Sequence, residues 1–189
     1  MDFVPIVSIG LLLALCAGAM VHDLLSRRIP NTLVVAGVAL GLLFQAFAPA
    51  GAGLFAPAGG GLGVTAALAG GLAGLALFLP MYALRALGAG DVKLLAMCGV
   101  WLGATGVAWA ALWTVLAGGV LALAYALWTG VLGRVLANLR FMLTTSLLEA
   151  QNGRSAAVEA PIGLTGRLPY ALAITCGVAA QALRQWAGS

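Results

Sequence analysis

The chain has 189 residues, of which 63% are hydrophobic and 7% are charged, whereas an ordinary soluble domain is about 25% charged. Nine basic and five acidic side chains are too few to cover a water-facing surface, so a soluble globular protein is excluded. The formal net charge is +4, but the basic residues are dispersed along the chain, which argues against a nucleic-acid-binding protein.

The charged residues leave long uncharged stretches that predict membrane-spanning helices. These stretches contain 20, 56 and 40 residues, at 3–22, 29–84 and 94–133. A helix needs about 20 apolar residues to cross the hydrocarbon core, so they have room for one, two and two spans. A weaker apolar stretch near the end supplies a sixth, which predicts a single-domain, all-α integral membrane protein over residues 1–189, a bundle of six transmembrane helices. The six predicted spans are residues 3–21, 32–47, 62–84, 92–102, 107–132 and 168–186.

The connections between the spans carry turn and capping signals. Pro30 ends the first polar connection, and Asn31 is well placed to cap the helix that follows. A turn is expected at 103–106. Residues 134–167 are expected on the cytoplasmic side, as an amphipathic helix along the membrane surface followed by a polar loop. The G-G-L-A-G segment at 70–74 has the spacing of small residues that lets helices pack closely.

The three cysteines, Cys16, Cys98 and Cys176, all fall in predicted spans. They form no C-x-x-C pair that would suggest a zinc or redox site, and we expect them to pack as small apolar side chains. No metal ion or organic cofactor is expected.

The distribution of basic residues predicts the topology. Eight of the nine lie in alternate connections, and only Arg184 lies on the other side. The positive-inside rule therefore places those connections in the cytoplasm and both termini outside it. Asp23, at the end of the first span, and Asp91, at the start of the fourth, then share the cytoplasmic edge.

Ionisable residues beside membrane spans are costly, so each is a candidate functional residue. Asp23 has the alternative of an interfacial acid paired with Arg27, four residues later in the helix. Asp91 has the alternative of a turn residue or helix cap after Gly88 and Gly90. A shared function explains the position of both acids at one predicted edge of the membrane more easily than two independent structural roles do.

Three motifs resemble those of one family, the type IV prepilin peptidases. G-A-G-D-V-K-L at 88–94 resembles its G-x-G-D signature, and D-L-L-S-R-R-I-P-N at 23–31 is similar to its first-aspartate motif. L-P-Y-A-L-A-I at 168–174 is similar to its last-span signature. The motifs occur in the family's order, and the resemblance covers essentially the whole chain. The residues expected to support the site are Gly88, Gly90, Lys93, Arg27, Pro30, Asn31, Pro169 and Tyr170.

The resemblance implies an intramembrane aspartic endopeptidase of the bacterial inner membrane. It would cleave the leader from prepilins or pseudopilins at the cytoplasmic face, with Asp23 and Asp91 as the catalytic pair. One carboxylate would take a proton from the attacking water while the other, protonated, polarises the peptide carbonyl. Two close carboxylates tend to share one proton, and which is base and which is acid stays open.

Within this family the chain resembles the short branch that serves Flp, or tight-adherence, pili. Larger members of the family carry a cytoplasmic domain with four cysteines and also methylate the new amino terminus. The chain lacks both cysteine pairs, so N-methyltransferase activity is not expected. The bilayer and the prepilin are the expected partners. The pilin's identity, its cleavage sequence, the oligomeric state and the approach of a basic leader to a basic face stay open.

A non-enzymatic membrane protein is the alternative. In a small transporter or a pilus-assembly scaffold, the two acids would carry protons or hold helices together. A transporter more naturally places such acids near the middle of the membrane and often shows internal repeats. The two acids here lie at one predicted edge, and no repeat is visible.

Overall fold

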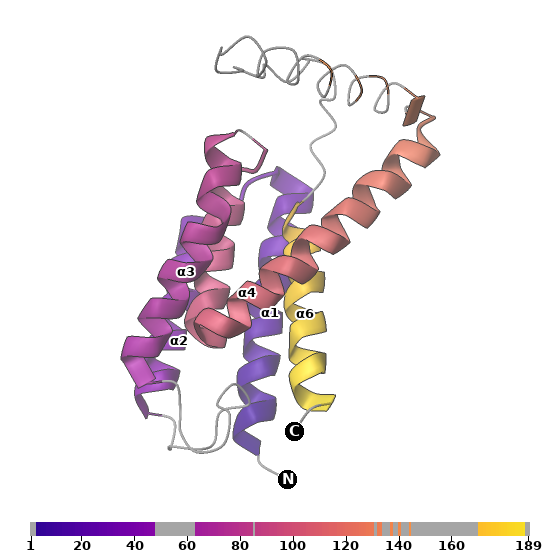
Figure 1. The fold of residues 1–189 in the computed structure, drawn as a ribbon. Coiled ribbons are helices and arrows are strands. Elements are labelled where there is room, and N and C mark those ends of the chain that lie inside the picture. The colour runs from indigo at the N-terminus through magenta and orange to yellow at the C-terminus, as the bar shows by residue number, and fades with distance from the viewer. Residues whose placement is uncertain are drawn as a thin grey trace. The chain divides into compact units, whose positions relative to one another are not determined.

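The computed structural model shows an all-helical arrangement (Figure 1). Its helices are α1 (Phe3–Ser26), α2 (Asn31–Phe47), α3 (Gly63–Ala83), α4 (Ala89–Trp128) and α6 (Tyr170–Ala187). The residues that the structure describes are 3–47, 63–84, 86–130, 132, 133, 137, 140, 144 and 170–187.

The chain forms two compact units. Met1–Gly118 and Pro169–Ser189 make the first, and Gly119–Leu168 the second. The second unit begins with the end of α4, where the Thr129 hydroxyl donates to the Tyr125 carbonyl at 2.7 Å. The predicted surface helix and polar loop at 134–167 lie outside the described residues, apart from the single positions 137, 140 and 144. All of the candidate site residues that the structure describes belong to the first unit.

Three described segments are long and apolar enough to cross a membrane: Val7–Ser26, Gly63–Ala83 and Ala89–Trp128. The helix α2 is shorter but also apolar. Large apolar side chains such as Leu68 and Leu72 of α3 stand exposed, as suits surfaces that face lipid. By helix composition the chain is a multi-pass membrane protein, while the count of six spans and their orientation stay predictions.

The helix α4 is interrupted at Gly103, within the turn that the sequence predicts. Gly103 has φ 71° and ψ 176°, a conformation that glycine adopts without the steric penalty of a Cβ. Asp91, before the break, acts electrostatically on Tyr170, and Gly118, after it, lies against the same tyrosine. Residues 104–118 of α4, which belong to the first unit, therefore run back along the part of the helix before Gly103, as Figure 1 shows.

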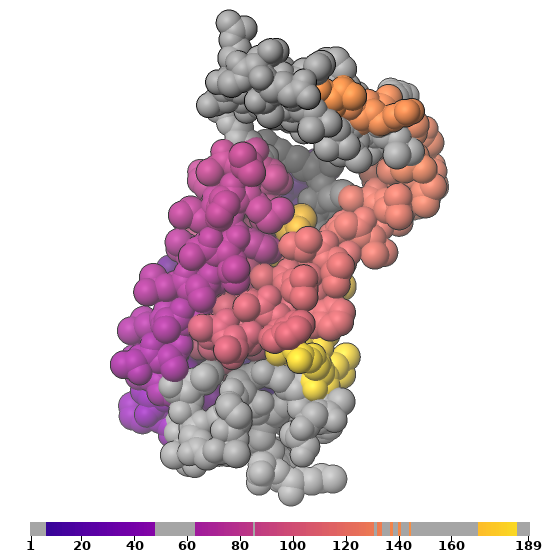
Figure 2. All heavy atoms as spheres, viewed as in Figure 1, coloured from indigo at the N-terminus to yellow at the C-terminus, as the bar shows by residue number. Residues whose placement is uncertain are grey.

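Small residues let α3 approach α4 closely. The buried face of α3 consists of Ala67, Gly70, Gly74 and Phe78. A Cβ added at Gly70 would overlap the carbonyl oxygen of Gly99 on α4. The backbones are in contact here, as the small-residue spacing at 70–74 predicts. Figure 2 shows the side chains of α3 lying against those of α4 on one face of the first unit.

Trp101 is the largest fully buried side chain among the described residues, and it connects α4 to α2. Its Nε1 donates to the carbonyl of Gly37 at 3.0 Å, and the Gln45 amide donates to the Trp101 carbonyl at 3.3 Å. The ring of Phe44 stacks on it with 5.7 Å between centroids. Because buried polar groups must be bonded in a water-poor interior, these contacts fix the register of α2 on α4.

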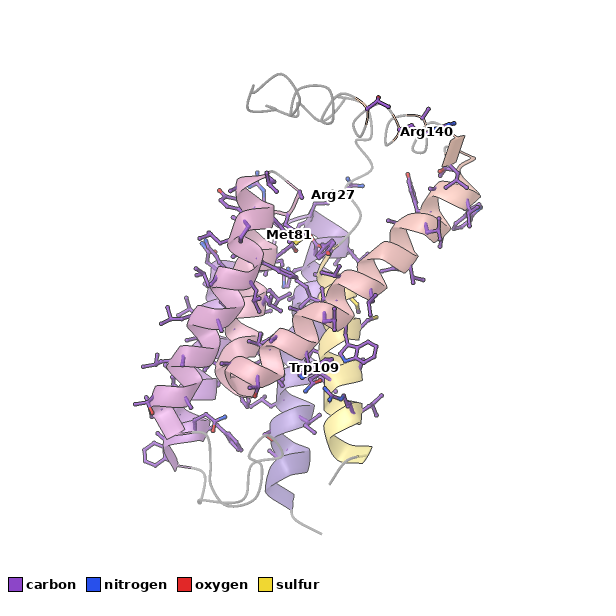
Figure 3. The ribbon with its side chains drawn as sticks, in the orientation of Figure 1. Arg27, Met81, Trp109 and Arg140 are labelled. Atoms are coloured by element: carbon purple, nitrogen blue, oxygen red, sulfur yellow. The ribbon has the colours of Figure 1, made fainter. Side chains whose placement is uncertain are left out.

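On α6, Arg184 lies near the end of the helix, away from Tyr170. Its guanidinium carbon is 4.0 Å from the ring centroid of Trp109. Figure 3 labels Trp109 on α4, after the break at Gly103. A cation over an aromatic face is favourable where water is scarce. This contact and the one between Tyr170 and Gly118 show that α6 runs antiparallel to residues 104–118 of α4, which lie in the same unit.

Candidate functional site

Asp23 lies in the last turn of α1 and is half-buried. Its Oδ2 accepts a hydrogen bond from the backbone N–H of Ala171, the second residue of α6, at 3.4 Å. The first N–H groups of a helix have no partner within the helix, and the helix dipole makes this end positive. The start of α6 is therefore a suitable neighbour for a carboxylate, and it holds Asp23 in one direction.

Asp91 is the third residue of α4 and is also half-buried. Its Oδ2 accepts from the backbone N–H of Gly88 at 3.0 Å, while its own N–H donates to the Gly88 carbonyl at 3.1 Å. A carboxylate three residues into a helix that bonds back to the preceding turn is a known capping arrangement. The capping role considered from the sequence is thus present, and it fixes the carboxylate at the entry to α4.

The two aspartates come close enough to interact. The charge of Asp23 acts on Asp91, and the charge of Asp91 acts in turn on Tyr170. Since Ala171 follows Tyr170 and bonds to Asp23, the start of α6 lies beside both acids. The ends of α1, α4 and α6 that carry the three sequence motifs therefore meet.

Two further contacts connect the first motif to the second. A Cβ added at Gly90 would lie 3.3 Å from Cβ of Ile29, so glycine allows the α4 turn to approach the segment after α1. The Lys93 ammonium donates to the Asn31 side-chain oxygen at 3.2 Å. Asn31 is the first residue of α2, and the oxygen that we expected to cap that helix bonds to Lys93.

The other predicted supporting residues have mainly structural positions. Arg27 follows α1 with φ 51°, and its backbone N–H donates to the Asp23 carbonyl at 2.9 Å. Its side chain is exposed (Figure 3). The Pro30 carbonyl accepts from the N–H of Val34 at 3.3 Å, at the start of α2. Pro169 lies outside the described residues.

Sequence reasoning did not single out Ile29, Phe78 or Gly118 as parts of this region. Phe78 packs edge-on against Tyr170, with 6.2 Å between ring centroids, and Gly118 contacts the same ring. These contacts join residues that are far apart in sequence, and neither Phe78 nor Gly118 belongs to a motif. Only the helical periodicity that places Phe78 on the buried face of α3 gave a signal.

The chemistry available here is that of two carboxylates held by backbone amides. Within the described helices, no three side chains of the His, Cys, Asp and Glu types form a group that could hold a metal ion. Paired carboxylates can transfer protons to and from a reacting water and a carbonyl oxygen. The arrangement therefore suits the hydrolysis of a polar bond.

Comparison with known proteins adds a family assignment. A sequence model described as the type IV leader peptidase family matches residues 10–148, which include both aspartates and more than half of the chain. The comparisons with curated proteins and with solved structures give no match.

Proposed function

The chain belongs to the type IV leader peptidase family, and from this we propose that Asp23 and Asp91 form the catalytic pair of a prepilin peptidase. Membership implies an aspartic peptidase, a hydrolase, and suggests prepilin leaders as substrates. The observation that carries the proposal for this chain is the meeting of the two acids beside the start of α6. If Asp23 and Asp91 had only separate structural roles, they would not need to lie close to each other.

The proposed reaction is hydrolysis of one peptide bond. One aspartate, ionised, accepts a proton from water as the water oxygen bonds to the peptide carbonyl carbon. The other, protonated, gives its proton to the carbonyl oxygen. The C–N bond then breaks, the first aspartate returns its proton to the departing amine, and a hydroxyl of the intermediate returns one to the second. Both carboxyl groups end in their starting states.

The proposal includes the orientation and the branch of the family. The site faces the cytoplasm because eight of nine basic residues lie in the connections on that side. Pilins of the Flp type, or pseudopilins, are the proposed substrates. We propose that these 189 residues leave the new amino terminus unmethylated, since they contain only three cysteines, none in a paired motif.

We expect Asp23→Asn and Asp91→Asn each to lower the rate of leader cleavage on the order of 10³-fold, because the amide keeps the shape but transfers no proton. The measurement is cleavage of a purified prepilin by detergent-solubilised protein. The protein level and the unfolding midpoint should stay close to those of the wild type.

Asp2→Asn provides the matched control, because it makes the same chemical change at an acid outside the proposed pair. It should leave cleavage unchanged. A variant of Asp23 or Asp91 that still cleaves at nearly the wild-type rate would remove that residue from the catalytic pair. Absence of cleavage by the wild type would favour the transporter or scaffold alternative.

A further inference from the structure

Tyr170 begins α6 and lies half-buried where α6 meets α3 and α4. Its ring packs against Phe78 of α3, with 6.2 Å between centroids and 68° between the planes. It also touches α4 at Gly118, where an added Cβ would lie 3.1 Å from Cε2 and the hydroxyl oxygen and 3.2 Å from Cζ. Gly118 therefore gives the ring space that any side chain would reduce.

The same residue adjoins the aspartate pair. Ala171 follows it directly and donates its backbone N–H to Asp23 at 3.4 Å, and Asp91 acts on Tyr170 electrostatically. A hydrogen bond of this length is already beyond the usual range, so a small displacement of the first turn of α6 would break it. The Tyr170 ring and the N–H that contacts Asp23 therefore belong to the same turn of α6.

We propose that Tyr170 is a positioning residue for the aspartate pair. Its ring, held by Gly118 and Phe78, fixes the first turn of α6 so that the Ala171 N–H orients the Asp23 carboxylate. The Phe78 contact is made between rings, and two of the three atoms nearest Gly118 are ring carbons. The aromatic ring rather than the hydroxyl therefore carries this role, which rests on the proposed function and extends it to α3 and α4.

Two neighbouring glycines allow a matched test. Gly118→Ala places a Cβ against the Tyr170 ring, whereas nothing lies within 4 Å of a Cβ at Gly119. Both substitutions remove one glycine from the same helix, so their effect on helix propensity is the same. We expect Gly118→Ala to lower kcat about threefold to tenfold with little change in KM, since small misplacements reduce rates steeply. Gly119→Ala should cleave like the wild type.

Substitutions of Tyr170 separate the ring from the hydroxyl. Tyr170→Ala should lower kcat on the order of a hundredfold with KM nearly unchanged. Tyr170→Phe keeps the ring and should recover most of that loss. The double variant Gly118→Ala with Tyr170→Ala should be no slower than Tyr170→Ala alone, because the ring that the added methyl displaces is gone.

The unfolding midpoint of each variant separates positioning from stability. If Tyr170→Ala fails to fold, Tyr170→Leu and the two glycine variants carry the same test. Equal rates for Gly118→Ala and Gly119→Ala would overturn the proposal, as would a Tyr170→Phe rate no better than that of Tyr170→Ala. Either result, with an active wild type and an inactive Asp23→Asn, leaves the peptidase assignment intact. An inactive wild type would instead contradict the proposed function.

Discussion

At the scale of single residues, the two aspartates share one feature: each is held by a backbone amide. Asp23 accepts from Ala171, and Asp91 accepts from Gly88. Lys93 lies only two residues after Asp91, but residues two apart on a helix do not face each other. Its ammonium bonds to Asn31 instead. A cation against either carboxylate would hold it ionised and so oppose the sharing of one proton. Amide donors orient the acids without adding a full charge.

This arrangement predicts that the two acids act as one unit. The double variant Asp23→Asn with Asp91→Asn should cleave a prepilin scarcely more slowly than either single variant. The reason is that one transition state needs both groups, so removing either already removes it. The measurement compares the rates of the wild type, the two single variants and the double variant under identical conditions.

Independent contributions would give a different result. In that case the two rate losses would multiply, and the double variant would be slower than each single one by the full factor of the other. Such multiplication would contradict a shared proton-transfer step, even if both residues proved necessary.

At the scale of helices, glycine determines how closely α3 and α4 pack. Gly70→Ala should destabilise the protein by about 1–3 kcal/mol, the usual cost of overpacking, because the added Cβ meets the Gly99 carbonyl and the Gly103 backbone. Backbone atoms move less readily than side chains. The measurement is the free energy of unfolding in detergent or lipid.

Gly10→Ala is the control for this prediction. Gly10 lies in α1, is exposed, and has nothing within 4 Å of an added Cβ. Replacing a mid-helix glycine in open space should leave stability unchanged or raise it by up to about 1 kcal/mol. Equal stability of the two variants would show that the α3–α4 contact is looser than the structure has it.

The pairing of α1 with α4 offers a chemical test. Cys16 lies seven residues before Asp23, and Cys98 lies seven residues after Asp91. Both thiols therefore lie about 10 Å, or two helical turns, from the acids and on the same helix faces. Their sulfur atoms are 3.5 Å apart and buried. A small apolar oxidant such as iodine should join them, with a mass loss of two hydrogens and protection of two thiols from alkylation.

Cys176 should remain available to alkylation in the oxidised protein. Cys16→Ser should abolish the intrachain bond and leave both remaining thiols reactive once the protein is unfolded. Retention of three reactive thiols in the oxidised wild type would contradict the pairing of α1 with the first half of α4.

The sequence predicts much of this arrangement because the motifs mark the ends of helices. The two acids follow from the spacing of the charges, the break at Gly103 follows from backbone preference, and the glycines before Asp91 follow from the resemblance of their motif to the family signature. The position of the Tyr170 ring does not follow from the sequence, since it depends on contacts with Phe78 and Gly118 that form only when the helices pack. Likewise, Asn31 has the signature of a helix cap, but its bond to Lys93 requires the start of α2 to meet α4.

At the scale of the whole molecule, the helix directions relate the position of the site to the predicted membrane topology of the chain. The end of α1 and the starts of α4 and α6 carry residues of the site. If these ends face the cytoplasm, the start of α1 and the end of α6 face the opposite side. Arg184 lies near that far end of α6, next to Trp109, whereas Arg27, Arg28 and Lys93 lie near the site. The described helices therefore place Arg27, Arg28 and Lys93 at the end opposite to Arg184, in agreement with the predicted topology, whose orientation stays a prediction.

This agreement predicts that residue 153 faces the cytoplasm. In a background with the three native cysteines replaced by serine, Gly153→Cys should react with a membrane-impermeant thiol reagent in inverted vesicles but not in intact cells. Ser189→Cys should show the reverse pattern, because the positive-inside rule places both termini outside. Labelling of Gly153→Cys from outside intact cells would reverse the orientation. The aspartate pair would then lie on the side of the membrane opposite to newly made prepilin leaders, so the result would also remove cytoplasmic leader cleavage as the function of the site.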